Sequence, residues 1–444
     1  MKVIMQDNDF LTTDINQKHL IIKRGLVTFL ITIAYIAMAT IPLPFINQAV
    51  FHNIIHDNHL QILQTINLLD GSNIQQGSIL MIGIMPFITV QLIMQILQTG
   101  LSKKVKALSE TSTGQVKLGI LTKLITVPIT FVQSWFTLST IDRISKSSIF
   151  INHVNNHVLM YFYLSLVLTT CTLIVIWFSD LNTLYGLGNG LNYIITCSII
   201  ISLIQNSALN KNIFKQWYHA LGTKLIVIIV IGLILLWLYN ALYIWYQSSY
   251  LALPLHFSQL NSSVTKTGVL PFSLNIANVM PVCFASITIN ALYMLSLWQK
   301  SLHGLVNFVN FKTWGSIFVY AILLVAFTYV FTLITFYPPT LSENLDRQSI
   351  YITGVAPTLQ TIDFLFKAIM KLATGNILFL MLVVIVPMII CKLSGLAPNV
   401  MLSSATVFII ITTEIDIRRQ ISGLSAKTHV PTLFDNEIVK LQEK

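Results

Sequence analysis

The sequence predicts an all-α polytopic membrane protein with ten transmembrane helices. Of its 444 residues, 55% are hydrophobic and only 9% are charged, and the mean hydropathy is +0.75. Soluble domains carry roughly 25% charged residues, so this composition excludes a soluble fold. The apolar runs are close to the ~20 residues that a helix needs to cross the hydrocarbon core. A membrane barrel would instead show alternating segments of about ten residues, so the spans are expected to be helical.

The apolar segments can be followed in order, because each is ended by a charge, a Pro/Gly turn or a polar loop. They cover residues 25–45, 78–99, 118–139, 157–178, 187–205, 223–247, 276–298, 314–337, 373–392 and 396–415. Most of the 26 Lys and Arg fall on the side of the N-terminus, so the positive-inside rule places both termini in the cytoplasm. Five spans per half give the halves opposite orientations in the membrane. We therefore expect two inverted halves, 1–210 and 211–420, and a cytoplasmic tail, 421–444.

Three loops are long or charged enough to receive a partner. Loops 248–275 and 338–372 are expected on the cytoplasmic side of the second half. The loop KKVKALSETSTGQ, which begins at Lys103, is cationic through Lys103, Lys104 and Lys106. It is either an orientation signal facing lipid headgroups or a docking loop. Membrane orientation and contact with lipid headgroups also account for the net charge of +10, so nucleic-acid binding is not expected.

The second apolar segment, Ser78–Leu97, differs from an ordinary membrane anchor. Gly83 and Pro86 are expected to loosen its first turns and to act as a hinge. Its polar side chains at membrane depth are Thr89, Gln91 and Gln95. Polar groups in lipid cost free energy unless they face protein or a water-filled cavity. This segment is therefore expected to line such a cavity.

The residues suggest no catalytic centre and no cofactor. We find no Ser/His/Asp set, no HExxH motif and no paired carboxylate within an apolar run. His52, His56 and His59 have the spacing of one helix face, but they lie in a polar external stretch and are expected to be solvated. The glycines of 186–190 are expected to serve a tight turn with close helix contact, since no strand precedes them. Coupled transporters keep ionisable residues at mid-membrane, so their absence favours a gate or a conduit.

Five short motifs occur in order at the ends of the predicted segments. They are IPLPFIN at 41–47, GIMPFI at 83–88, GLGNG at 186–190, LPFSLNIANVMPVCFAS at 270–286, and ENL at 343–345 after FYP at 336–338. These stretches resemble motifs of the SecY protein-conducting channels of the Sec translocase, and the resemblance covers nearly the whole chain. The segment 62–78 takes the position of the family's plug. Helices two and seven take the positions of its lateral gate.

The resemblance implies a pore closed by a ring of aliphatic side chains, which seals against ions by dewetting. Matching motif positions gives the ring residues Ile84, Ile88, Leu191, Ile195, Cys283 and a member in the tenth helix, Ile409 or Ile410. The lateral-gate positions are Gln95, Gln133 and Phe284. Through this gate, apolar segments of a substrate would pass sideways into lipid.

A passive channel for unfolded polypeptides is the function that the resemblance implies. The expected partners are a SecE-like small subunit, a SecG-like subunit, the SecA motor ATPase or a ribosome, the polypeptide substrate and membrane lipids. Two other classes compete with this interpretation. One is a secondary transporter with broken helices, and the other is a degenerate relative that acts as an insertase or scaffold.

Three departures from the family pattern bear on coupling and compartment. Phe45 replaces the glycine of the first motif, Ala356 replaces the arginine of a GIRPG loop, and residues 247–261 contain no Lys or Arg. The last two leave open whether SecA or a ribosome docks here. An Ile-, Asn- and Lys-rich composition without a transit peptide suggests a plastid-encoded protein of the thylakoid membrane. A bacterial inner membrane is the alternative.

Overall fold

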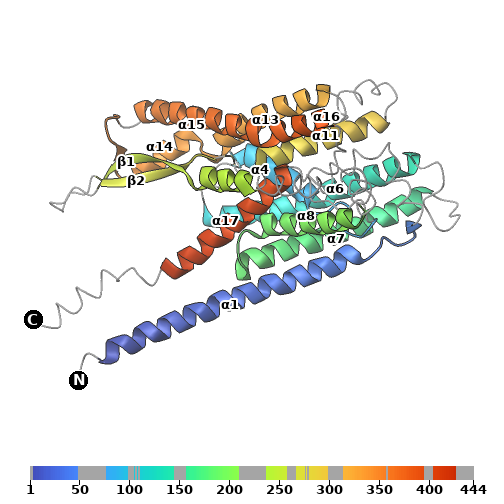
Figure 1. Ribbon diagram of the computed structural model, residues 1–444, viewed down its shortest axis with the longest axis horizontal. Helices are drawn as coiled ribbons and strands as arrows, with labels where there is room; N and C mark the ends of the chain where they lie inside the picture. The colour runs from blue at the N-terminus through green and yellow to red at the C-terminus, as the bar shows by residue number, and fades with distance from the viewer. Residues whose placement is uncertain are drawn as a thin grey trace, which may run out of the picture.

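Helices that run side by side along the longest axis form most of the molecule (Figure 1). The structure is a computed structural model. It describes residues 4–48, 77–98, 105, 108, 111–144, 157–209, 237–257, 267–275, 277, 280–298, 314–356, 359–394 and 404–426. Its helices in the first half are α1 (Ile4–Thr40), α4 (Met85–Ile96), α6 (Ser112–Ile144), α7 (His157–Tyr185) and α8 (Gly190–Leu209). The second half contributes α11 (Met280–Trp298), α13 (Trp314–Thr335), α14 (Pro338–Arg347), α15 (Leu359–Leu380), α16 (Val386–Ser394) and α17 (Ser404–Ala426).

The membrane character predicted from the sequence is confirmed by the length of these helices. Within the described residues, five stretches are long and apolar enough to cross a bilayer: His19–Thr40, Thr113–Arg143, His157–Tyr185, Trp314–Arg347 and Leu359–Ile389. Three shorter apolar helices accompany them: Met85–Ile96, Gly190–Ser202 and Met280–Ile289. Every predicted segment overlaps helical residues. Of the segment predicted at 223–247, however, the structure describes only residues 237–247, which lie in the helical stretch 237–248. The number of ten spans therefore stays a prediction.

The start of the second segment differs from the sequence prediction. Residues 78–84 are not helical; they form turns and an isolated bridge from Ser78 to Pro42. The backbone N–H of Leu43 donates to Gly77 O at 2.8 Å, which fixes this entry against the chain after α1. Gly83 has φ +62° and lies before the helix, and Pro86 lies in the first turn of α4. A proline in the first turn costs no hydrogen bond, so Pro86 starts the helix here and does not loosen it.

The two loops predicted to be cytoplasmic, 248–275 and 338–372, together supply the strands of one small sheet. Its strands are β1 (Tyr250–Phe257), β2 (Thr267–Ser273) and β3 (Ile350–Ile352), in the antiparallel order β2-β1-β3. The register pairs Leu253 with Leu270 and His256 with Tyr351. Strand β3 comes from loop 338–372, and β1 and β2 come from loop 248–275. The sheet, the first residues of α1 and the end of α17 all lie at one end of the molecule (Figure 1).

The ninth predicted segment, 373–392, is the second part of a much longer helical run. Helix α15 begins at Leu359, inside the predicted loop, and passes through a π-helical stretch, η4 (Met381–Ile385), into α16. The first turns of α15 pack under the sheet. There Leu365 and Ile369 are fully buried in an apolar cluster with Leu255 and Ile352. These first turns are amphipathic, so their mean hydropathy is lower than that of a membrane span. For this reason hydropathy alone predicted that the segment begins later than the helix does.

Candidate pore and its surroundings

The ring residues named from the sequence lie together in the largest buried cluster. Ile84 directly precedes α4 and Ile88 lies in its first turn, Leu191 and Ile195 come from α8, Cys283 from α11, and Ile409 from α17. Their exposed fractions run from 2% for Ile88 and Ile409 to 7% for Leu191. Ile410 is partly buried and packs against the same cluster. Four helices, two from each half, thus contribute aliphatic side chains or a thiol to one dry region.

The residues predicted at the lateral gate lie in different surroundings. Phe284 is buried on α11 and packs on the phenyl rings of α13, with its ring centroid 5.0 Å from that of Phe331. Gln133 is half-buried on α6. Helix α6 packs against α4 and also reaches across to α11. Gln95 lies near the end of α4, where it lines a cavity.

That cavity has a volume of about 450 Å³ and lies among α4, α6 and α7. Its polar lining is Gln91, Gln95, Gln98, Gln115, Thr122, Lys123 and Asp180, and its apolar lining includes Phe87, Met94 and Leu118. The amides of α4 therefore face a cavity, as the polar pattern of Ser78–Leu97 predicts. Cavities of this size with a few convergent polar groups are typical of sites that hold water or small ligands.

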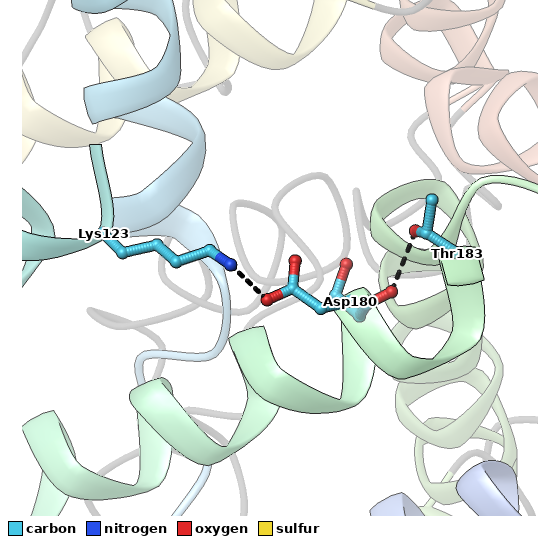
Figure 2. A network of polar contacts seen from close by, with 4 residues as sticks. Lys123, Asp180 and Thr183 are labelled. Atoms are coloured by element: carbon cyan, nitrogen blue, oxygen red, sulfur yellow. Dashed lines mark hydrogen bonds and ion pairs between the residues drawn. The ribbon is translucent and has the colours of Figure 1, made fainter. Parts of the chain in front are cut away.

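Two of the lining residues, Lys123 and Asp180, form an ion pair, which Figure 2 shows. The Lys123 ammonium on α6 donates to the Asp180 carboxylate on α7, and Thr183 bonds the backbone of its own helix close by. The sequence predicted that this apolar segment ends at residue 178, whereas α7 continues to Tyr185 and carries Asp180. Both side chains remain about 40% exposed (43% and 39%). Pairs with this exposure contribute little to stability, so the pair mainly orients α6 and α7.

The glycine run 186–190 makes the close approaches that the sequence predicts. Gly188 has φ +78°, and a Cβ there would lie 2.8 Å from the Ile417 side chain of α17. A Cβ on Gly190 would lie 1.9 Å from the backbone oxygen of Ser179. Only glycine lets the chain turn this tightly from α7 into α8. The turn places the first residues of α8 directly against α17.

Some predicted positions lie outside the described residues. Lys103, Lys104 and Lys106 of the cationic loop are among them, and so are residues 62–76 of the plug segment and the histidines at 52, 56 and 59. Of the plug segment, only Gly77 and Ser78 are described, and both are buried.

The sequence analysis missed a line of polar contacts between α8 and α17. Thr196 Oγ1 and Thr413 Oγ1 are 2.8 Å apart, and Asn192 Nδ2 donates to Asp416 Oδ2 at 3.1 Å. A usable signal was present, because Asn192 and Thr196 are spaced i, i+4 and fall on one helix face of an apolar segment.

Solved protein-conducting channels share this arrangement of helices. The structure is similar to "The structure of a protein conducting channel", with a TM-score of 0.58 and 14% identity over 93% of this chain and 94% of that one. It is also similar to Sec61 in the canine ribosome-channel complex from the endoplasmic reticulum. That match has a TM-score of 0.56 and 14% identity, and covers 93% and 94% of the two chains. The chain is therefore a helical membrane protein with the fold of this class of channel.

Sequence comparison assigns the family. The family model for SecY matches residues 78–418, and the chain belongs to the SecY family. Relatives include the protein translocase subunit SecY of Streptococcus sanguinis, 28% identical over 90% of this chain and 93% of that protein. The corresponding subunit of Lactococcus lactis subsp. lactis is 28% identical over 94% and 95%.

Proposed function

We propose that this chain is the channel subunit of a protein translocase, which conducts unfolded polypeptides across a membrane and releases apolar segments sideways into lipid. One observation carries the proposal. The aliphatic residues expected at the constriction come from four helices of both halves and meet in one buried cluster. A ring of such side chains excludes ions because water leaves a narrow apolar constriction, yet it holds no group that would bind a passing peptide tightly.

The secondary-transporter alternative receives no support from the site. Its hallmark is an ionisable or ion-coordinating site at mid-membrane. The buried cluster that joins the two halves is instead apolar. The Lys123–Asp180 pair is half-exposed and lies among α4, α6 and α7 of one half.

Crosslinking a stalled secretory precursor tests the channel. Cysteines at Ile88 and Ile195 are introduced singly into a background whose native cysteines are replaced, and both are expected to crosslink to the precursor. The matched control is Leu324→Cys, since Leu324 is equally buried in the same cluster but on α13. Crosslinks confined to Gln95 and Phe284 would favour an insertase. Crosslinks at none of these positions would contradict the channel.

For partners, we propose a SecE-like subunit, a SecG-like subunit and either SecA or a ribosome at the cytoplasmic end. The sheet is a suitable docking surface, because it brings strands of both long loops together at one end of the molecule (Figure 1). The exposed Ala356, which follows β3, supplies no charge there. We propose the cationic Lys103, Lys104 and Lys106 as a second contact with the partner. Co-purification of the full chain with SecA and with ribosomes, compared with a Lys103→Gln/Lys104→Gln/Lys106→Gln variant, tests which of them binds.

For the compartment, we propose the thylakoid membrane of a plastid, on the support of the Ile-, Asn- and Lys-rich composition. Immunoblots of fractionated plastids would detect the chain in thylakoids. Detection only in a bacterial inner membrane fraction would favour the alternative.

A further inference from the structure

Helix α17 belongs to the second half, yet its polar face is bonded to the first half. Four hydrogen bonds join it to α8 and the turn before it. Gly188 N–H donates to Gln420 Oε1, Asn192 Nδ2 to Asp416 Oδ2, and Thr413 Oγ1 to Asn192 O, and the Thr196 and Thr413 hydroxyls pair with each other. Residue numbers rise on one partner as they fall on the other, so the two helices are antiparallel and in register. We call this line of contacts the α8–α17 seam.

The seam is dry at the end that meets the ring. Thr196 and Thr413 are 7% and 3% exposed, and their hydroxyl oxygens are 2.8 Å apart. Thr413 also bonds Ile409 O at 2.9 Å, one turn away on its own helix. Thr196 Oγ1 likewise bonds Asn192 O of its own helix at 2.9 Å. Separating the helices would therefore lose the contact between the two hydroxyls, while each hydroxyl keeps a carbonyl partner within its own helix.

Ring residues directly adjoin the seam. Leu191 and Ile195 each precede a seam residue of α8, and Ile409 shares the face of α17 that carries Thr413 and Asp416, at i, i+4 and i+7 spacing. The neighbouring residue Thr412 bonds Tyr243 OH at 2.7 Å, which ties α17 to the helical residues 237–248 on its other side. Helix α17 is thus held between helices of both halves.

We propose that Asn192, Thr196, Thr413 and Asp416 are positioning residues that keep α8 and α17 together while the pore opens elsewhere in the ring. The proposal rests on the channel function proposed above. During transport, the side chains of α4 and α11 move away, whereas Leu191, Ile195 and Ile409 remain a fixed wall. The hydrogen bonds across the seam set the spacing of that wall in the closed state.

A disulfide across the seam tests the fixed wall. Thr196→Cys and Thr413→Cys are combined, because the two threonine oxygens lie so close that sulfur atoms in their place can reach bonding distance by small rotations. The neighbouring Cys197 is replaced by serine, so that the only thiols at the seam are the two introduced ones. After mild oxidation, the rate of precursor transport in proteoliposomes is expected to stay within about twofold of the rate of the reduced channel. A twofold change corresponds to ~0.4 kcal/mol. Loss of transport on oxidation with recovery on reduction would overturn the proposal.

Ion leak tests the positioning role independently of disulfide formation. The Thr196→Val/Thr413→Val variant keeps the shape but loses the hydrogen bond, and it should raise resting ion conductance several-fold. Serine at both sites should restore the wild-type leak. The control is Thr328→Val, because Thr328 is fully buried on α13 and its hydroxyl bonds Leu324 O of its own helix. Wild-type leak in the valine pair would overturn the proposal.

The two proposals fail in different ways. A wild-type chain that transports no precursor, in proteoliposomes with its partners present, contradicts the channel function itself. A wild-type chain that transports, beside an oxidised seam variant that does not, contradicts only the fixed wall.

Discussion

Phe45 adopts a backbone conformation that suits glycine. Its φ is +64°, and the family motif that the sequence resembles has glycine at this position. The left-handed conformation costs a residue with a side chain ~1–2 kcal/mol. The Phe45 ring contacts Tyr163 edge-on, with centroids 5.9 Å apart, and such aromatic pairs contribute about 0.5–1.5 kcal/mol. The contact therefore offsets part of the strain.

Substitutions at Phe45 separate the backbone strain from the aromatic contact. Phe45→Gly and Phe45→Val both lose the ring contact, but only glycine relieves the backbone. The glycine variant should be more stable than the valine variant by about 1–2 kcal/mol. Thermal unfolding of the two variants in the same detergent measures the difference. Equal midpoints would show that the backbone is not strained here.

Asp416 is the seam residue whose charge should respond to pH. It lies just beyond the apolar stretch 396–415. Burial raises its pKa above the ordinary value, and the hydrogen bond from Asn192 and the charge of Arg419 lower it only in part. A raised folded-state pKa stabilises the fold below the pKa of the unfolded chain, and this contribution is lost as the pH rises through the folded-state pKa.

In the Asp416→Asn variant this side chain no longer titrates, so its contribution to the stability of the fold does not depend on pH. An asparagine can still accept the hydrogen bond from Asn192 through Oδ1. The variant should unfold at a higher temperature than the wild type at neutral pH, and the difference should shrink on acidification. Thermal melts from pH 7 down to pH 4 measure it. A lower melting temperature for the variant at neutral pH would mean that the charged hydrogen bond outweighs the desolvation.

At the scale of elements, the entry of α8 depends on one glycine. Gly188 combines φ +78° with a Cβ position 2.8 Å from Ile417, and its N–H donates to Gln420 across the seam. Any side chain here strains the backbone and pushes α17 outward. The tight turn and the seam are therefore one structural unit.

Gly188→Ala should destabilise the protein by about 1–3 kcal/mol, since both the backbone conformation and the contact are unfavourable. The control is Gly375→Ala within α15, where nothing lies within 4 Å of the added Cβ. An exposed helical glycine replaced by alanine should stabilise by about 0.5–1 kcal/mol. Thermal unfolding compares the two, and an undisturbed Gly188→Ala variant would contradict the geometry of the turn.

At the scale of the whole molecule, the described residues contain separate apolar clusters. The largest holds the residues proposed to form the ring. Another lies beneath the sheet and joins β1, β2, β3, α14 and α15. Because the clusters are separate, we expect that the sheet end can loosen without opening the proposed ring.

Leu365→Ala tests this independence. Leu365 is fully buried under the sheet, and truncation of such a leucine costs ~2–5 kcal/mol. Limited proteolysis should cut within 248–275 and 338–372 faster, while resting ion conductance stays at the wild-type level. Leu378→Ala, on the same helix but 68% exposed, should change neither. A leak in the Leu365→Ala variant would show that the clusters are coupled.

Membrane character, the order of the apolar segments and the family could all be predicted from the sequence, because hydropathy and short motifs are local properties. The resemblance to the channel family also pointed to Ile84, Ile88, Leu191 and Ile195, and the structure places them in the same buried cluster. Short motifs can carry this information because they are read directly along the chain.

Which helices meet became visible only in the folded chain. The bridge from Ser78 to Pro42, the sheet between two loops ~100 residues apart, and the α8–α17 seam all join positions distant in the chain. The start of α4 at Met85 also depends on such contacts, because the turn at 78–84 is fixed by the chain after α1. Hydrogen-bond partners across helices depend on packing, and one sequence contains no direct record of it.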